Sequence, residues 1–393
     1  MFIRCKVIVL LLIACLTTIH LYADNLSDAK TVSTAPVTDS IKPKRNLLHK
    51  VLDYFNDANK EKTEKKFDVS FIGGPHYSSD TKFGIGLVAA GVYRTDRTDS
   101  ILQPSNVSLY GDVTTVGFYL LGIRGNHLFP HDKYRLNYNL YFYSFPSLYW
   151  GNGYDNGVND DNESAYKRFQ SNVEVDFMLR VAHNFYIGPR MTFEYIRGSK
   201  LQRPELWEGL RTTTYSSGVG FSILYDSRDF IPNAYRGYYL RINQRFSPRF
   251  LGNKNAFSSS ELTTSYYQQL WKGGVLASQF HTQLTYGNPP WGLMATLGNS
   301  HSMRGYYEGR YRDKCAMDAQ VELRQHVWRR NSATVWLGAG TVFPDFKALR
   351  GNHILPNYGI GYRWEFKKRM NVRLDLGFGK HQTGFIFNIN EAF

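Results

Sequence analysis

Apolar and polar residues alternate with a period of two from Phe67 to the end of the chain. In the stretch NVEVDFMLR, the apolar set is Val173, Val175, Phe177 and Leu179, and the polar set is Asn172, Glu174, Asp176 and Arg180. The stretches 135–142 and 371–378 divide in the same way. Because successive side chains of a strand point to opposite faces, this pattern predicts β-strands that separate an apolar surface from a charged one.

The length of the alternating segments distinguishes between two all-β architectures. A soluble β-sandwich uses strands of about five or six residues around an aliphatic core. Here the segments run near ten residues, aromatic residues and glycine are frequent, and about sixteen segments follow Phe67, which suits the ~9–11 residues of a tilted membrane strand. Residues 67–393 are therefore predicted to form a sixteen-stranded antiparallel transmembrane β-barrel with lipid outside and a polar lumen inside.

The chain begins with a segment typical of secretory signal peptides. Basic residues precede an apolar run from Val7 to Leu16, and Leu21-Tyr22-Ala23 resembles a cleavage site. We expect residues 1–23 to be a signal peptide; the alternative is a lipoprotein cleaved before Cys15. Later segments fall short of the ~18 consecutive apolar residues of a membrane-spanning helix, so we expect export without a helical anchor.

Two segments separate the signal from the barrel. Residues 24–45 are rich in Ser, Thr, Asp and Pro and predict a flexible linker. Within residues 46–66, apolar residues recur at helical spacing from Leu47 to Phe55, which predicts one short amphipathic helix. Three placements of this helix are open. It could lie on the periplasmic membrane surface, close the barrel mouth, or be an ordinary solvated helix packed on one side.

The net charge indicates which binding partners to expect, and the cysteine content indicates whether the mature chain can form disulfides. The formal charge of +14 becomes +12 when Arg4 and Lys6 leave with the signal peptide. In an exported protein, this excess favours outer-membrane lipids and lipopolysaccharide as partners over nucleic acid. Only Cys315 lies outside the signal peptide, so the mature chain is expected to form no internal disulfide.

Connections of two lengths are expected at the two ends of the barrel. FPHDK, WKGG and FKKRM are short enough for periplasmic turns, whereas YWGNGYDNGVNDDNES and GNSHSMRGYYEGRYRDK are long enough for surface loops. Tight turns at one end and long loops at the other are typical of outer-membrane barrels. The final segment, GFIFNINEAF, is expected to set Phe385, Phe387, Ile389 and Phe393 on one face.

Three motifs resemble the BamA/TamA superfamily of bacterial outer-membrane barrels, also called bacterial surface antigens. They are the Arg-Gly-aromatic loop and Glu-x-Arg strand of SMRGYYEGRYRDKCAMDAQVELR, the hairpin LYDSRDFIPNAYRGYYLRI with Asp226, Arg228, Asp229 and Gly237, and the carboxyl terminus with Phe385, Phe387 and Phe393. The resemblance covers residues 67–393. It implies a bacterial outer-membrane location and recognition of the aromatic terminus by the outer-membrane assembly machinery during biogenesis.

The resemblance also implies that the Arg-Gly-aromatic loop folds back into the lumen. Arg304 would then need a carboxylate partner, because a buried unpaired charge is costly. The phase of DAQVELR points Glu322 into the lumen, which makes it the expected partner. Gly305 would let the backbone approach the wall, and Tyr306 would pack against it.

One position departs from the family pattern. The family has a second partner for the arginine, an aspartate that aligns with Gly338 in this chain. That contact is therefore missing, and Asp318 is the expected substitute. Arg310 and Arg312 are expected in solvated positions nearer the return of the loop.

The segment between the signal peptide and the barrel is too short for the periplasmic domains that many family members carry. Family members that insert or secrete proteins carry periplasmic POTRA domains of ~75 residues, whereas residues 24–66 number only 43, so a short, POTRA-less member is expected. Such a barrel would assist assembly or translocation of outer-membrane proteins through a weak seam between its first and last strands, with a separate periplasmic partner. The alternative is a passive pore or structural barrel.

An outer-membrane lipid hydrolase is a further alternative. Ser300, His301, Ser302 and His281 supply the residue types of a catalytic pair, but adjacent residues of a strand point in opposite directions and no oriented acid follows. The acidic loop 155–163 lacks the residue order of a calcium-binding loop. We therefore expect no enzyme activity, no cofactor and no metal.

Overall fold

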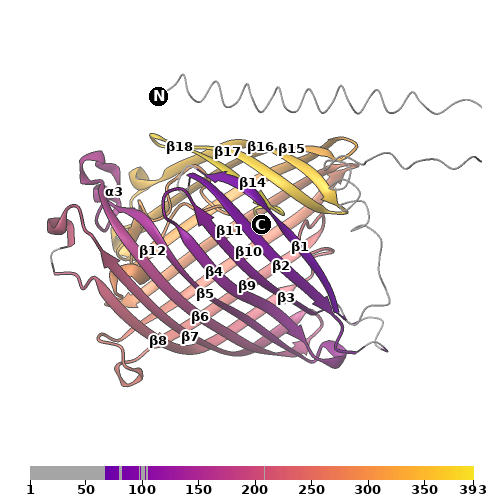
Figure 1. Cartoon of the computed structure of the whole chain (residues 1–393), viewed down its shortest axis with the longest axis horizontal. Helices are drawn as coiled ribbons and strands as arrows, with labels where there is room; N and C mark the ends of the chain where they lie inside the picture. The colour runs from indigo at the N-terminus through magenta and orange to yellow at the C-terminus, as the bar shows by residue number, and fades with distance from the viewer. Residues whose placement is uncertain (1–66, 79–81, 97, 99–101, 103–104, 208) are drawn as a thin grey trace, which may run out of the picture. The chain divides into compact units, whose positions relative to one another are not determined.

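Sixteen antiparallel strands form the wall of the barrel in the computed structural model (Figure 1). The structure describes residues 67–78, 82–96, 98, 102, 105–207 and 209–393. The predicted strand number and antiparallel order are confirmed. The wall strands are β1 (Phe67–Ser78), β2 (Lys82–Tyr93), β3 (Ser105–Thr114), β4 (Tyr119–Leu128), β5 (Tyr134–Tyr149), β6 (Ser164–Ala182), β7 (Phe185–Ser199), β8 (Thr213–Asp226), β9 (Gly237–Ser247), β10 (Phe257–Trp271), β11 (Gly274–Gly287), β14 (Cys315–Trp328), β15 (Asn331–Phe343), β16 (Leu355–Lys367), β17 (Met370–Gly379) and β18 (Gln382–Ile389).

The strands pair in sequence order around the wall, and β11 pairs directly with β14. The circle is completed where β1 meets β18, and among the described residues this pairing consists of a single register pair, Ser78 with Ile386. By contrast, β1 pairs with β2 from Phe67 to Ser78. The β1–β18 contact, which we call the seam, is therefore the weakest junction among the described strands.

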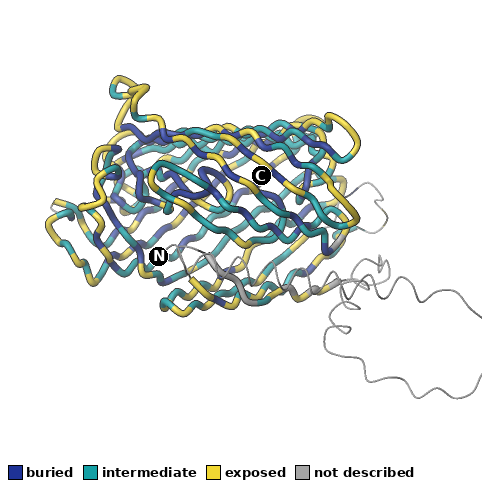
Figure 2. Tube along the Cα trace, turned by 90° about the horizontal axis from the view of Figure 1, so that it is seen from above, coloured by how far each residue is buried: buried dark blue, intermediate teal, exposed yellow. Residues whose placement is uncertain are grey.

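The outward and inward faces of the strands differ in solvent exposure, as the alternation predicts. On β15, Val335 and Leu337 point outward and Leu337 is 72% exposed, whereas Thr334 and Trp336 between and beside them are buried. Buried residues alternate with more exposed ones along many of the strands (Figure 2). An apolar outer surface of this kind is stable only against lipid, because a soluble protein rarely exposes so large an apolar area.

The short connections and the long loops that the sequence analysis named lie at opposite ends of the barrel. The connections β4–β5, β10–β11 and β16–β17 are short and share one end, the turn end. The other end, the loop end, carries the β5–β6 and β11–β14 loops, where α3 is seen in Figure 1. The loops and turns contain α3 (Tyr154–Val158), β12 (Ala295–Thr296), β13 (Arg312–Asp313) and the short 3-10 turns η1 (Pro130–Asp132), η2 (Asp160–Asn162), η3 (Pro204–Trp207), η4 (Arg249–Leu251), η5 (Trp291–Leu293), η6 (Phe346–Ala348) and η7 (Gly351–His353).

Three predictions fall on residues outside the described part of the chain. They are the signal peptide 1–23, the linker 24–45 and the amphipathic helix and linker 46–66. Among the described residues, helices are too short and too polar to cross a membrane.

Candidate functional site in the barrel lumen

The β11–β14 connection, residues 288–314, reaches into the barrel, and we call it the lumen loop. The short strands β12 and β13 pair with each other inside it. At its tip, Arg304 and Tyr306 form an isolated bridge, and the Arg304 side chain is completely buried. Such a loop needs partners from the wall, since buried polar groups must be hydrogen-bonded or paired.

Two carboxylates from different strands bind Arg304. Its Nη2 lies 2.7 Å from Oε2 of Glu322 on β14, and its Nη1 lies 2.8 Å from Oδ2 of Asp375 on β17. The guanidinium also lies 3.7 Å from the ring centroid of Trp336 on β15. The structure therefore places the residue expected from the sequence, Glu322, against Arg304, together with a partner that the sequence did not indicate.

Asp318 is not that second partner, so the expectation that it substitutes for the missing aspartate was wrong. One of its carboxylate oxygens lies 3.1 Å from His281 Nδ1 on β11, and the other accepts a hydrogen bond from the hydroxyl of Ser302. With both oxygens engaged toward β11 and the loop, Asp318 leaves Arg304 to Asp375. The contact that Gly338 cannot make thus comes from β17, two strands further round the wall.

The two partners of Arg304 belong to a larger buried charge network. Glu322 also binds Arg324 at 2.7 Å, and Asp375 binds Arg363 at 2.6 Å. The network comprises four arginines and three carboxylates, which are Arg304, Arg324, Arg363, Arg373, Glu322, Asp375 and Glu391. Shared carboxylates with several guanidinium donors offset the desolvation of each charge, which explains how so many charges are buried together.

Glycines bring the tip of the lumen loop against the wall. Gly305 adopts a φ of +115°, which L-residues with side chains rarely adopt, and a Cβ added there would lie 2.6 Å from the carbonyl carbon of Gly377. On β18, a Cβ on Gly384 would lie 2.9 Å from Gly305 Cα. The close approach expected for Gly305 is therefore made to β17 and β18, the last two strands of the wall.

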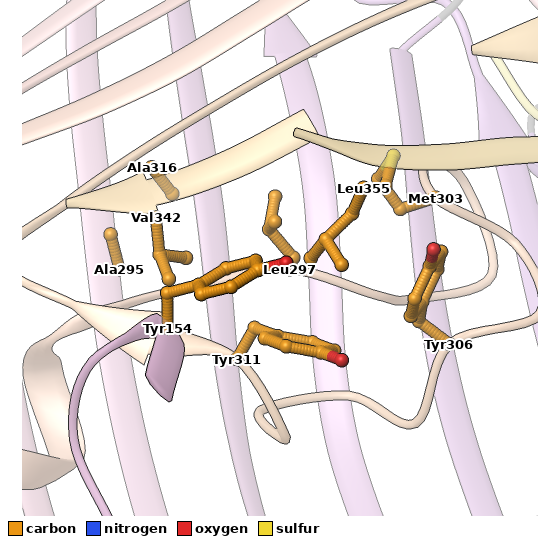
Figure 3. Packing of buried hydrophobic residues seen from close by; sticks show 9 residues of the cluster. All are labelled: Tyr154, Ala295, Leu297, Met303, Tyr306, Tyr311, Ala316, Val342 and Leu355. Carbon is orange, nitrogen blue, oxygen red and sulfur yellow. The ribbon is translucent and has the colours of Figure 1, made fainter. Parts of the chain in front are cut away.

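Tyr306 anchors the other side of the tip. Its hydroxyl donates a hydrogen bond to the carbonyl of Pro356 on β16 at 2.6 Å and accepts one from the backbone N–H of Lys380 at 2.7 Å. Its ring belongs to a buried cluster shown in Figure 3, whose members are Tyr154, Ala295, Leu297, Met303, Tyr306, Tyr311, Ala316, Val342 and Leu355. The lumen loop thus has its own apolar core inside the barrel.

Arg310 and Arg312 are buried, and the expectation that they are solvated was wrong. Nε of Arg310 donates to the carbonyl of Gly157 at 2.8 Å, and its Nη2 binds Asp160. The guanidinium of Arg312 lies 5.2 Å from the ring centroid of Tyr149. Both side chains are covered because the β5–β6 loop packs against the lumen loop, a long-range contact that local sequence does not reveal.

The carboxyl terminus also departs from the expected arrangement. Phe387 is on the outward face, but Phe393 packs beside Tyr267 and Ala277, and its carbonyl accepts a hydrogen bond from Arg324 at 2.8 Å. The physical cause is Asn390, whose φ of +68° ends the alternation after β18. The other two sequence-identified aromatic residues, Phe385 and Phe387, lie within β18.

Glu391 and Ala392 connect the terminus to the network and the lumen loop. Oε2 of Glu391 lies 2.8 Å from Nε of Arg363, and the carbonyl of Ala392 is hydrogen-bonded to His301 Nδ1 at 2.7 Å. Figures 1 and 2 both show the carboxyl terminus away from the barrel ends. Glu391 was missed in the sequence because a charged residue so close to the last position resembles an ordinary solvated tail, and the Ala392 contact is made by its backbone carbonyl.

The hairpin motif lies at the turn end. Asp226 binds Arg228 at 2.7 Å, and Gly237 takes a φ of +115° where a Cβ would lie 2.8 Å from Arg228 Cα. Asp229 accepts from the backbone N–H of Tyr235 at 2.9 Å and binds Arg369 of the β16–β17 turn at 2.8 Å. Burial acts to raise the pKa of Asp229, but these donors hold it below its ordinary value.

The residues considered for hydrolysis are arranged differently from a catalytic pair. A carboxylate, Asp318, accepts from the Ser302 hydroxyl, and His281 binds the other side of that carboxylate and lies 3.5 Å from Glu261. His301 is turned to the carbonyl of Ala392. Among the described residues, side chains of His, Cys, Asp and Glu are nowhere gathered in threes that could hold a metal ion.

The family model described as the Omp85 superfamily domain matches residues 123–393. No curated protein matches the chain. In solved structures, the chain is similar to BamA from Haemophilus ducreyi lacking POTRA domains 1–3, with a TM-score of 0.54, 14% identity, and coverage of 83% of this chain and 70% of that one.

CdiB proteins share the fold as well. CdiB from Acinetobacter baumannii has a TM-score of 0.53 and 12% identity, and CdiB from Escherichia coli has 0.56 and 10%. Each comparison covers 83% of this chain but only 60% and 63% of the CdiB chains, respectively. The family match, which spans more than half of the chain, and the shared barrel show that this protein is a bacterial outer-membrane β-barrel that belongs to the Omp85 superfamily.

Proposed function

We propose that this barrel assists the assembly or translocation of outer-membrane proteins by opening at the seam between β1 and β18. Substrate strands would enter at the turn end, which faces the periplasm in this proposal, and a separate periplasmic partner would deliver them. Insertion then proceeds at the opened edges, because unpaired strand edges are ready templates for further pairing.

The observation that carries the proposal is the pairing at the seam. In the described part of the chain, one register pair joins β1 to β18, whereas β17 pairs with β18 from Val372 to Gly379. Opening the seam thus breaks few backbone hydrogen bonds, while opening elsewhere in the wall breaks a full ladder. Each such bond contributes roughly 0.5–1.5 kcal/mol, so the seam is the junction that opens first.

The lumen loop supports the wall while the seam opens. It binds β14 and β17 through Arg304 and contacts β17 and β18 through Gly305. In this proposal, the loop keeps the last strands in position and leaves β1 as the strand that moves. The motifs of the loop, the hairpin and the terminus thereby act together in the structural support of one opening edge.

Depletion of the protein combined with planar-bilayer recording tests the proposal. We expect depletion to lower the levels of other outer-membrane proteins, and the purified barrel to show only small, transient conductance because the lumen loop occupies the lumen. Large, steady conductance with unchanged outer-membrane protein levels would instead establish a passive pore.

A further inference from the structure

Three cations gather on the outside of the barrel at the loop end. Lys167 is on β6, Arg197 is on β7, and Arg211 lies two residues before β8 begins at Thr213. Strand register brings them together, because Arg197 pairs with Phe169 on one side and with Thr213 on the other, and Lys167 pairs with Ser199. We call Lys167, Arg197 and Arg211 the outer basic patch.

The alternation of the strands shows that these side chains face away from the lumen. On β7, Met191 and Phe193 are exposed on the outer surface, and Arg197 continues the same face and is itself exposed. On β6, Lys167 lies between Tyr166, which is buried, and Arg168, which binds Gln170 inside the barrel. The patch therefore belongs to the outer wall.

The patch differs from nearby inward cations on β7 and β9, which bind acidic partners. Arg190 on β7 binds Asp176 at 3.0 Å, and Arg245 on β9 binds Glu194 at 2.6 Å. Within the part of the chain that the structure describes, carboxylates stay beyond ion-pair distance from all three cations of the patch. Three neighbouring positive charges repel one another unless an anion lies among them.

A layer of aromatic side chains lies directly beneath the patch, toward the middle of the barrel. Phe169 and Tyr195 have ring centroids 5.9 Å apart, and Tyr195 and Tyr215 have centroids 4.9 Å apart. Tyr215 is 61% exposed on the outer surface. Aromatic girdles mark the level of the lipid headgroups around outer-membrane barrels, so this layer places the outer basic patch at headgroup level.

We propose that the outer basic patch binds the phosphate groups of lipopolysaccharide in the outer leaflet. The three cations lie at the level of phosphorylated headgroups, they face the lipid, and the aromatic layer below them contacts the acyl chains. Arginine and lysine are well suited to phosphate oxygens, and unpaired cations close to an anionic lipid surface contribute favourably to binding. The proposal rests on the orientation in our proposed function, with the loop end outward.

Binding measurements on the full-length barrel in lipid nanodiscs test this site. The test variant is Lys167→Gln, Arg197→Gln and Arg211→Gln combined, and the matched control is Lys254→Gln, Lys347→Gln and Arg350→Gln, which removes the same charge from exposed positions in other loops at the same end. The probes are lipopolysaccharide, the same lipopolysaccharide with its lipid A phosphates removed, and phosphatidylglycerol. A heat-dependent gel shift establishes that each variant is folded.

We expect the test variant to bind lipopolysaccharide roughly 10- to 100-fold more weakly than the wild type, and the control to bind as the wild type does. Removing the phosphates should weaken wild-type binding to the level of the test variant. Equal binding by the two variants, or a loss confined to phosphatidylglycerol, would overturn the proposal. The depletion experiment reports on the assembly role and the binding experiment on the patch, so the two proposals fail separately.

Discussion

At the scale of single residues, the alternation along a strand predicts which face a side chain lies on, but not which group it binds in the lumen. The alternation in DAQVELR points Glu322 inward, and the structure has it 2.7 Å from Arg304. The same alternation also points Asp318 inward. Which of Asp318 and Asp375 pairs with Arg304 depends on the strand that the loop tip reaches. Sequence gives the face of each side chain, whereas the choice among inward carboxylates requires the path of the loop.

Replacing Arg304 should destabilise the barrel more than replacing Arg310. Arg304→Ala leaves Glu322 and Asp375 buried with one fewer cation, which should cost ~3–5 kcal/mol. Arg310→Ala removes a pair with Asp160, whose side chain is 76% exposed, and the hydrogen bond to the Gly157 carbonyl, so its loss should cost a smaller ~1–3 kcal/mol. The measurement is the temperature at which the folded gel band converts to the unfolded one.

Limited proteolysis of the same proteins in detergent provides a second reading. Cleavage within residues 298–314 should accelerate strongly for Arg304→Ala and only slightly for Arg310→Ala. Arg304→Lys is the conservative comparison, and it should remain impaired because an ammonium lacks the forked donors that bind two carboxylates. Equal protection of all variants would show that the Arg304 pairs do not hold the loop.

At the scale of elements, the wall was predictable and the packing inside it was not. Period-two alternation identified the strands because each membrane strand must present one face to lipid and one to the lumen. The position of Phe393 was missed because a single left-handed residue, Asn390, turns the chain after β18. Likewise, Arg310 and Arg312 are covered by the β5–β6 loop, which is remote in sequence.

The contact between the lumen loop and β17 depends on the absence of a side chain at Gly377. A Cβ there would overlap the carbonyl of Arg304, so Gly377→Ala should push the loop tip from the wall and speed its proteolysis. Gly111→Ala on β3 is the matched control, since its nearest neighbour, the carbonyl oxygen of Leu120, lies at an ordinary 3.5 Å. The same protease sensitivity in both variants would contradict the close-contact explanation.

Phe393 should stabilise the folded barrel in addition to any part in biogenesis. Phe393→Ala removes packing against Tyr267 and Ala277 and should lower the free energy of unfolding by about 1–3 kcal/mol. Phe387→Ala, which alters an outward residue, is the comparison for urea unfolding of refolded protein in detergent. An unchanged urea midpoint for Phe393→Ala would mean that its lumenal contact contributes nothing.

At the scale of the whole molecule, the pairings between neighbouring wall strands differ in length. Long ladders join most neighbouring strands, the lumen loop ties β14, β17 and β18 together, and the single pair at the seam is left as the place to open. The alternation predicted the number of strands, whereas the weak seam was expected only from the family resemblance, because pairing length depends on how the first and last strands meet. Membership of the Omp85 superfamily agrees with the wall and leaves the role of the seam to experiment.

Locking the seam with a disulfide tests the central claim most directly. Ser78→Cys and Ile386→Cys, in a Cys315→Ala background, place two cysteines at a register pair, where Cα atoms ~4.5–5.5 Å apart suit a disulfide. The control pair is Val335→Cys with Ile360→Cys, within the β15–β16 ladder. Assembly of other outer-membrane proteins should stop when the seam pair is oxidised and recover on reduction, while the control pair has no effect; undiminished assembly with the seam fully cross-linked would contradict the account.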